Sequence, residues 1–147
     1  MHWHSLIGDS GESREGTLSK GEVTKYKPGA ANNGVSLLDP VLAEIANRWF
    51  GIEDGNSFDC FAGDSVFGYV SSALGQTFTG IELREDQAKL NNDRTAGMKA
   101  KYICDDGRNV LNHIPENSQD LLFSCPPYFD LEVYSDLPND ASNQKEY

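Results

Sequence analysis

The sequence predicts an α/β protein in which a parallel sheet is flanked by helices. Beyond residue 37, short apolar segments of strand length alternate with longer segments that carry apolar residues at helical spacing. Glycine, proline or acidic residues follow each strand-length segment, as is typical of strand ends. Strands that alternate with helices pair in parallel. The length of 147 residues fits one domain of this kind.

The chain is expected to have two parts. Residues 1–36 are rich in Gly, Ser, Lys and Glu and predict a polar N-terminal arm, whereas residues 37–147 predict the folded domain. His2 and His4 in the arm are too few to form a metal site, so we expect a frayed terminus and no bound metal.

The first ordered element is predicted to be a helix over residues 40–50. Asp39 can cap it, Pro40 fits its first turn, and Gly51 ends it. Six apolar residues then share one helix face, and we expect them to pack in the core: Val41, Leu42, Ile45, Ala46, Trp49 and Phe50.

The remaining elements alternate regularly. Strands are predicted at residues 57–61, 77–83, 101–104 and 120–124, helices at 66–74 and 84–98, and a short helix or turn at 108–114. The carboxyl ends of parallel strands lie at one edge of the sheet, where ligands bind in such folds. We therefore expect the residues that follow the four strands to form a single rim.

Composition and charge exclude several classes of protein. The 12 basic and 23 acidic residues give a net charge of -11, which disfavours contact with nucleic-acid phosphates and suits a cationic ligand. No apolar stretch approaches the roughly 20 residues of a membrane helix, and because no basic start is followed by an apolar stretch we expect no signal peptide. Cys60, Cys104 and Cys125 lack C-x-x-C spacing, so we expect free thiols in a reducing cytoplasm.

The turn after the first strand has the features of a ligand site. Gly63 permits close approach of a ligand to the backbone, and Asp59 and Asp64 flank it. Two carboxylates would repel a phosphate, and neither the dinucleotide fingerprint nor a P-loop is present. The turn therefore favours a ligand with an ammonium or sulfonium group.

Acidic residues also end the next two strands. Glu82 follows Gly63 by 19 residues, close to the spacing of about 20 at which an acid accepts hydrogen bonds from ribose hydroxyls. Asp106 at the end of the third strand could accept a hydrogen bond from an adenine amino group, and Asp105 competes with it for that role.

The fourth strand leads into a turn of unusual chemistry, residues 124–128. It consists of Ser124, Cys125, Pro126, Pro127 and Tyr128. Two prolines remove two backbone donors, which leaves carbonyl acceptors beside the ring of Tyr128. This arrangement suits a planar base with an exocyclic amino group, and a rigid strand exit is the alternative interpretation.

Together these segments resemble the S-adenosylmethionine-dependent DNA amino-methyltransferases. The resemblance depends on Asp59-x-Phe61-Ala62-Gly63, Gly80-Ile81-Glu82, Asp106 and residues 124–128, in that order. It covers residues 36–142 and is strongest with the phage-type DNA modification methylases. It implies a Rossmann-like methyltransferase fold, S-adenosylmethionine as cofactor, and methylation of adenine N6 or cytosine N4.

The resemblance also implies a role for each matching residue. The methionine part of the cofactor would be surrounded by residues of the first turn and by the helix at 39–50, the ribose bound by Glu82, and the adenine by Asp106 with apolar neighbours. The cofactor-binding residues are then Asp59, Phe61, Ala62, Gly63, Asp64, Ile81, Glu82 and Asp106, with Leu83 as a second apolar neighbour. The target base would stack on the aromatic ring of the last turn and donate its amino hydrogens to the side chain at Cys125 and to the next carbonyl.

Two positions differ from the family pattern, and the chain is short. Gly63-Asp64-Ser65 has one glycine fewer than the family's turn, and Cys125 replaces Asp, Asn or Ser, so we expect Ser124 to contribute. The family continues with further strands and a recognition region. We therefore expect a partial domain with the first half of the sheet, whose open edge is covered by a second copy or a complementing chain. DNA would bind through a region missing here, in a bacterial or phage-infected cytoplasm and away from membranes.

Two alternatives stay open. The acceptor could be RNA, protein or a small molecule, because the same cofactor site would serve. The chain could also be a catalytically inactive remnant or subunit that binds cofactor, an alternative to which Cys125 points.

Overall fold

The computed structural model describes residues 24–25, 38–127 and 132–144. The chain divides into two compact units, of which one is Leu38–Cys125 and the other combines Met1–Leu37 with Pro126–Tyr147. The arm boundary predicted at residue 36 lies outside the described residues and stays a prediction.

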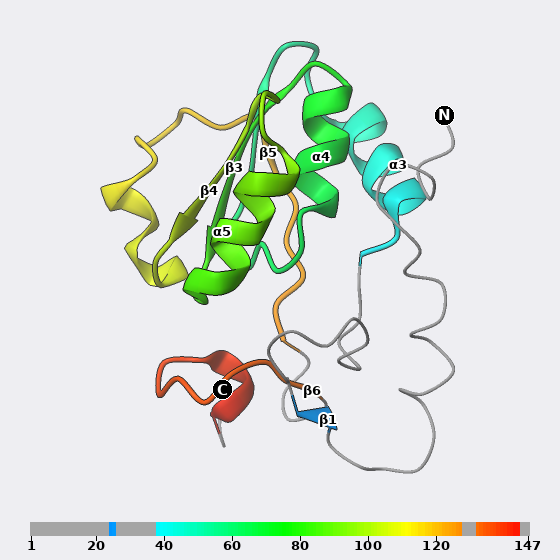
Figure 1. The fold of residues 1–147 in the computed structure, drawn as a ribbon. Helices are drawn as coiled ribbons and strands as arrows, with labels where there is room; N and C mark the ends of the chain where they lie inside the picture. Colours follow the sequence, from blue (N-terminus) through cyan, green and yellow to red (C-terminus); the bar gives the residue numbers. More distant parts are fainter. Residues whose placement is uncertain (1–23, 26–37, 128–131, 145–147) are drawn as a thin grey trace. The chain divides into compact units, whose positions relative to one another are not determined.

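The Leu38–Cys125 unit is built on a four-stranded parallel sheet (Figure 1). Its strands are β2 (Asn56–Asp59), β3 (Thr77–Glu82), β4 (Ala100–Cys104) and β5 (Leu121–Leu122), in the order β4-β3-β2-β5. The register pairs Asp59 with Gly80 and Glu82 with Cys104, so three strands end at the same edge. The predicted α/β fold is confirmed and is Rossmann-like.

Two helices form the connections between the first three strands of this sheet. α4 (Val66–Ala73) leads from β2 to β3 and α5 (Glu85–Arg94) from β3 to β4, and in Figure 1 both cover the same face. The short helix η1 (Gly107–Asn112) lies in the return connection to β5. α5 ends at Arg94 rather than near residue 98, because the Thr95 hydroxyl bonds to the Asn91 carbonyl at 2.9 Å and Gly97 adopts a φ of +81°.

The core between the sheet and α4 is aromatic. The rings of Phe67 and Phe78 meet edge to face, and Tyr102 packs against Phe78 and donates a hydrogen bond to the Ser65 carbonyl at 3.0 Å. A side chain at Gly80 would lie 2.9 Å from the Cβ of Ala62. Glycine at this position therefore lets β3 pass directly under the turn that follows β2.

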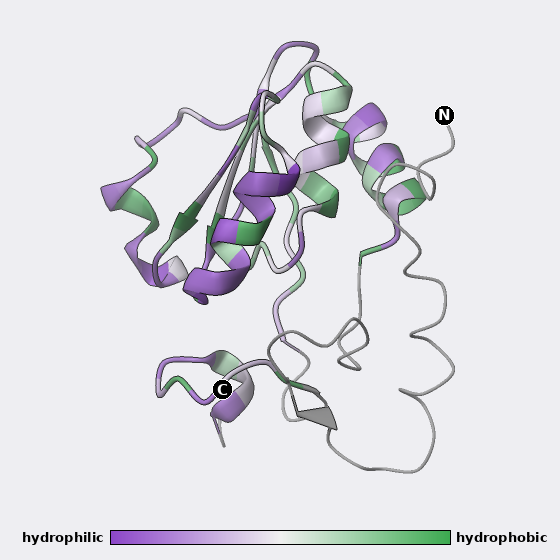
Figure 2. Cartoon of the chain, viewed as in Figure 1, coloured by the Kyte–Doolittle hydropathy of each residue, from purple (hydrophilic) through white to green (hydrophobic). Residues whose placement is uncertain are grey.

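Helix α3 (Pro40–Phe50) begins and ends as the sequence predicts. The Asp39 carboxylate accepts the Val41 N–H at 2.8 Å, and Gly51 closes the helix by bonding back to the Asn47 carbonyl at 2.9 Å. In Figure 2 the hydropathy colours alternate around α3, whereas α5 is mainly hydrophilic.

The expectation that the large apolar residues of α3 pack in the core is wrong. α3 packs on α4 through its small side, where Ala43 and Ala46 are buried and the Ser71 hydroxyl donates to Asn47 at 2.9 Å. Small residues allow the two helices to approach closely, which turns the bulky side outward. Five of the six predicted core residues are 36% to 74% exposed: Val41, Leu42, Ile45, Trp49 and Phe50.

The second unit contributes two short pieces of regular structure. β1 (Thr24–Lys25), inside the predicted arm, pairs in parallel with β6 (Glu132–Val133). η2 (Ala141–Asn143) is capped by Asp140, whose carboxylate accepts the Ser142 N–H at 2.8 Å and the Ser135 hydroxyl at 2.5 Å. No helix among the described residues is long and apolar enough to cross a bilayer.

Candidate functional site

The strand order identifies where a ligand site is expected. Numbered along the chain, the strands from β2 to β5 take the spatial order 3-2-1-4, which is the start of the doubly wound order. The direction of chain progression reverses between β2 and β5. Ligands of such sheets bind at that reversal, outside the carboxyl ends of the strands. The residues that end β2 and β5 therefore lie where a ligand is expected.

Asp59 and Ser124 meet at this position. The Ser124 hydroxyl donates to Asp59 Oδ1 at 2.6 Å, and the Phe61 N–H donates to the same oxygen at 2.8 Å. The sulfur of Cys60 lies 3.9 Å from the Ser124 hydroxyl. A residue of the predicted cofactor turn and a residue of the predicted catalytic turn are thus in direct contact, within one unit.

Asp59 has the electrostatics of a cation-binding group. The residue is only 5% exposed, and burial raises the pKa of its carboxyl to about 6, although the hydrogen bonds from Ser124 and Phe61 act in the opposite direction. No cationic side chain of the described residues pairs with it. A bound ammonium or sulfonium group would compensate for the lost hydration of the carboxylate.

Gly63 is held open toward a ligand. It has a φ of +53°, in the left-handed region that favours glycine, and its N–H donates to Glu82 Oε2 at 2.9 Å. A Cβ added there would meet only the Phe61 carbonyl, at 3.9 Å. The backbone conformation therefore favours glycine, and among the described residues no other atom lies within 4 Å of where a side chain would begin; close approach of a ligand stays a prediction.

Glu82 lies against the glycine turn instead of projecting into solvent. It is 7% exposed, its Oε1 accepts the Arg84 N–H at 3.0 Å, and the Arg84 Nε lies 3.4 Å from the same oxygen. An ionised carboxylate offers about four acceptor positions. Ribose hydroxyls would share these oxygens with the existing donors, so ribose binding by Glu82 stays a prediction.

Asp64 does not remain an unpaired acid beside Gly63. Its Oδ2 accepts the Arg94 guanidinium at 2.7 Å and its Oδ1 accepts the Ser65 hydroxyl at 3.1 Å. The pairing neutralises its charge locally. The cation-attracting role predicted for the two acids around Gly63 therefore falls mainly on Asp59.

The acids after β4 are engaged in local contacts. Asp106 caps η1 by accepting the Arg108 N–H at 2.9 Å and pairs with the Arg108 guanidinium at 2.6 Å. Asp105 contacts His113 and Asn109, hydrogen bonds that lower the pKa of its carboxyl. A Cβ at Gly107 would lie 2.6 Å from the Cys60 carbonyl, so this loop runs directly against the end of β2. Both acids thus reach the rim, and adenine contact by either stays a prediction.

The predicted apolar neighbours of the ligand separate into two groups. Ile81 is fully buried in the core and Ala62 is nearly so, which leaves their side chains little surface to offer a ligand. Phe61 is 43% exposed and Leu83 is half-buried. Any apolar wall beside the glycine turn therefore comes from Phe61 and Leu83.

The predicted catalytic turn crosses the boundary between the two units. Ser124 is half-buried and Cys125 exposed in the first unit, whereas the exposed Pro126 and the half-buried Pro127 belong to the second. Tyr128 lies outside the described residues. Only Ser124 and Cys125 can therefore be placed with Asp59. Among the described residues, no three His, Cys, Asp or Glu side chains gather as a metal site requires.

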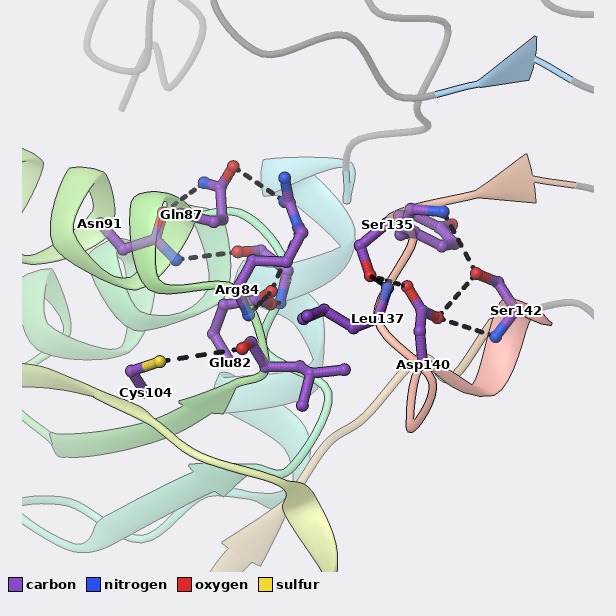
Figure 3. Close-up of polar contacts among 12 residues, drawn as sticks. Glu82, Arg84, Gln87, Asn91, Cys104, Ser135, Leu137, Asp140 and Ser142 are labelled. Atoms are coloured by element: carbon purple, nitrogen blue, oxygen red, sulfur yellow. Dashed lines mark hydrogen bonds and ion pairs between the residues drawn. The ribbon is translucent and has the colours of Figure 1, made fainter. Parts of the chain in front are cut away.

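One set of polar residues at the site is not predicted from the sequence. Arg84, Gln87 and Asn91 lie next to Glu82 and link it to the Gly63 carbonyl (Figure 3). Gln87 and Asn91 lie four residues apart on α5, and Arg84 caps the start of this helix three residues before Gln87, so the three side chains share one side of the helix. A polar helix face is ordinarily solvated, so the sequence does not distinguish these residues from surface residues.

Comparison with solved structures shows a likeness in fold. No family model and no curated protein matches the sequence. The crystal structure of a "putative RNA methyltransferase" from Pyrococcus horikoshii superimposes with a TM-score of 0.49 and 20% identity, over 65% of this chain and 48% of that one. The chain thus spans about half the length of that protein. A likeness of this extent leaves the chemistry to be argued from the site itself.

Proposed function

We propose that the Leu38–Cys125 unit binds S-adenosylmethionine at the carboxyl ends of β2, β3 and β4. We further propose that the protein transfers the methyl group to the exocyclic amino group of a DNA base, adenine N6 or cytosine N4. The contact between Asp59 and Ser124 at the reversal of strand order carries this proposal, since it joins the two sequence segments on which the family resemblance depends.

The residues at the rim fit the parts of this cofactor. The buried carboxylate of Asp59 suits the ammonium and sulfonium charges, and the open face of Gly63 suits close passage of the methionine chain. Glu82 suits the ribose diol, Phe61 next to Asp59 suits the methionine part, and Leu83 suits the flat adenine ring. When bound, the cofactor supplies an electrophilic methyl group on sulfur.

The protein's own contribution to methyl transfer is positioning. Because the Ser124 hydroxyl donates its hydrogen to Asp59, its oxygen lone pairs are available to accept a hydrogen from the target amino group. That bond would orient the nitrogen lone pair toward the methyl carbon. The thiol of Cys125 is a weak acceptor, so Ser124 has the larger part of this role.

Calorimetric titration with S-adenosylmethionine and S-adenosylhomocysteine tests the cofactor assignment. We expect saturable binding of both, and a loss of at least tenfold in affinity for Glu82→Gln. Asp93→Asn removes the same charge at an exposed position of α5, which pairs with Lys89 at 2.7 Å, and should bind as the unaltered protein does. The absence of heat and of a thermal shift with either ligand would reject the proposal.

Transfer of a labelled methyl group to DNA, RNA and protein identifies the acceptor. We expect label in DNA when a basic partner surface brings the DNA to the site, as the net charge of -11 requires. Label in RNA or protein alone would replace DNA by the alternative acceptor. Cofactor binding without transfer to any pool, also after Cys125→Asp, would indicate a cofactor-binding subunit.

A further inference from the structure

We propose that Arg84, Gln87 and Asn91 are positioning residues of the cofactor site. Together with Gly63 and Glu82 they form a closed ring of polar contacts, called the polar ring below. This inference rests on the proposed function, because it assigns a task to residues that flank the same site. None of the three would touch the reacting atoms.

The contacts of the polar ring can be followed in one direction. Arg84 Nη2 donates to Gln87 Oε1 at 3.1 Å, Gln87 Nε2 donates to Asn91 Oδ1 at 2.7 Å, and Asn91 Nδ2 donates to the Gly63 carbonyl at 2.8 Å. The Gly63 N–H then donates to Glu82 Oε2 at 2.9 Å, and Glu82 Oε1 accepts the N–H of Arg84 at 3.0 Å, which closes the ring. Figure 3 shows Glu82, Arg84, Gln87 and Asn91 arranged in this way.

The polar ring fixes both polar groups of Gly63. Its N–H is held by Glu82 and its carbonyl by Asn91, so the peptide planes on either side cannot rotate freely. The left-handed φ of +53° is one that glycine can leave at little cost, and without these bonds other conformations would compete. The polar ring therefore keeps the turn in the one conformation that presents its open face.

Most of the polar ring is shielded from water. Asn91 is fully buried, Arg84 is 9% exposed and Gln87 between them is half-buried, so water does not readily replace the hydrogen bond from Asn91 to the Gly63 carbonyl. Asn91 must donate at one end of its amide and accept at the other. Aspartate has the same shape but no hydrogen to donate, and its charge would face the Gly63 carbonyl.

Asn91→Asp and Asn92→Asp form a matched pair of variants. Asn92 is the next residue of α5 and makes the same type of bond, from its Nδ2 to the Tyr102 carbonyl at 2.8 Å, but it lies outside the polar ring. Asn91→Asp should lower thermal stability more than Asn92→Asp, because Asn91 is fully buried whereas Asn92 is exposed. Only Asn91→Asp should weaken S-adenosylhomocysteine binding, by tenfold or more, and shift the Gly63 amide resonance in a ¹H–¹⁵N spectrum.

Equal losses of affinity in the two variants, with the Gly63 resonance unmoved in both, would overturn the positioning role and leave the cofactor assignment intact. Failure of the unaltered protein to bind would reject the proposed function itself. Should Asn91→Asp not fold, Gln87→Met, at a half-buried position, breaks the polar ring one bond further away. It should cost about threefold in affinity with little change in thermal midpoint, and unchanged affinity would contradict the proposal.

Discussion

Asp59 couples the site to pH at the level of a single residue. Its carboxyl has a pKa of about 6 in the folded protein, against 3.8 as the ordinary value, so the folded state holds this proton longer than the unfolded chain does. Stability therefore falls as pH rises from about 4 to 6, by roughly 3 kcal/mol in total. The ionised, less stable form is the one that attracts a cation.

Asp59→Asn should remove this pH dependence. The asparagine oxygen can still accept from Ser124 and Phe61, so the variant should equal the unaltered protein near pH 4 and exceed it in free energy of unfolding at pH 8. Urea unfolding at both pH values measures the difference. Asp93→Asn, the same change at an exposed position, should show no difference that grows with pH. A constant difference for Asp59→Asn would contradict the expectation.

Alanine substitutions at Gly63 and Gly97 distinguish the effect of backbone strain from an effect on ligand binding. Both have positive φ values, +53° and +81°, and neither position would bring a Cβ within 3.5 Å of a neighbour. Alanine should therefore cost about 1–2 kcal/mol at either position, through conformation alone. Only Gly63→Ala should also weaken S-adenosylmethionine binding in a calorimetric titration. Equal affinities in the two variants would place the ligand away from the glycine turn.

At the scale of elements, the bulky apolar residues of α3 are exposed whereas its small residues are buried. Trp49 is 74% exposed, so Trp49→Ala should change the free energy of unfolding by less than about 0.5 kcal/mol. Ala43 is fully buried on the side that faces α4, and Ala43→Leu should cost about 1–3 kcal/mol by overpacking. Urea denaturation of the two variants measures both changes. A large loss of stability for Trp49→Ala would show that the bulky face of α3 is buried after all.

The same helix shows how far the sequence could predict an element. Its bounds follow from the cap at Asp39 and the stop at Gly51, which are local signals. The face that packs depends on the partner, and α4 presents Ser71 and a close surface that accepts alanines and Asn47. Periodicity alone favours the bulky face, because hydrophobic size is visible in a sequence and the shape of the neighbouring helix is not.

The rim of the sheet was predictable because local signals mark the ends of its strands. Strand ends are marked locally by Gly63, Glu82 and Asp106, and the parallel order then brings them to one edge. The polar ring was not predictable, because burial of Asn91 depends on how α5 lies against the turn. A buried polar side chain in a hydrophilic helix has the same sequence signature as a solvated one.

At the scale of the whole molecule, the distribution of charge matters more than its sum. Arginines from three different segments pair with acids of the rim: Arg84 with Glu82, Arg94 with Asp64, and Arg108 with Asp106. The sequence predicts an acidic site from the carboxylates alone, whereas among the described rim acids only Asp59 and Asp105 lack an arginine partner, and Asp105 contacts His113 instead. A net charge of -11 remains on the chain.

The net charge of -11 predicts how this chain alone behaves toward DNA. Binding of a duplex depends on cationic groups that displace counterions from phosphates, and a chain with 23 acidic and 12 basic residues lacks that excess. We expect no retention of a fluorescent duplex of about 20 base pairs by the protein at about 0.15 M salt, with or without S-adenosylhomocysteine. Anisotropy measured down to low salt, with a basic DNA-binding protein as positive control, tests this. Binding that persists at about 0.15 M salt would show that the chain itself holds a basic surface, and transfer to DNA would then need no partner.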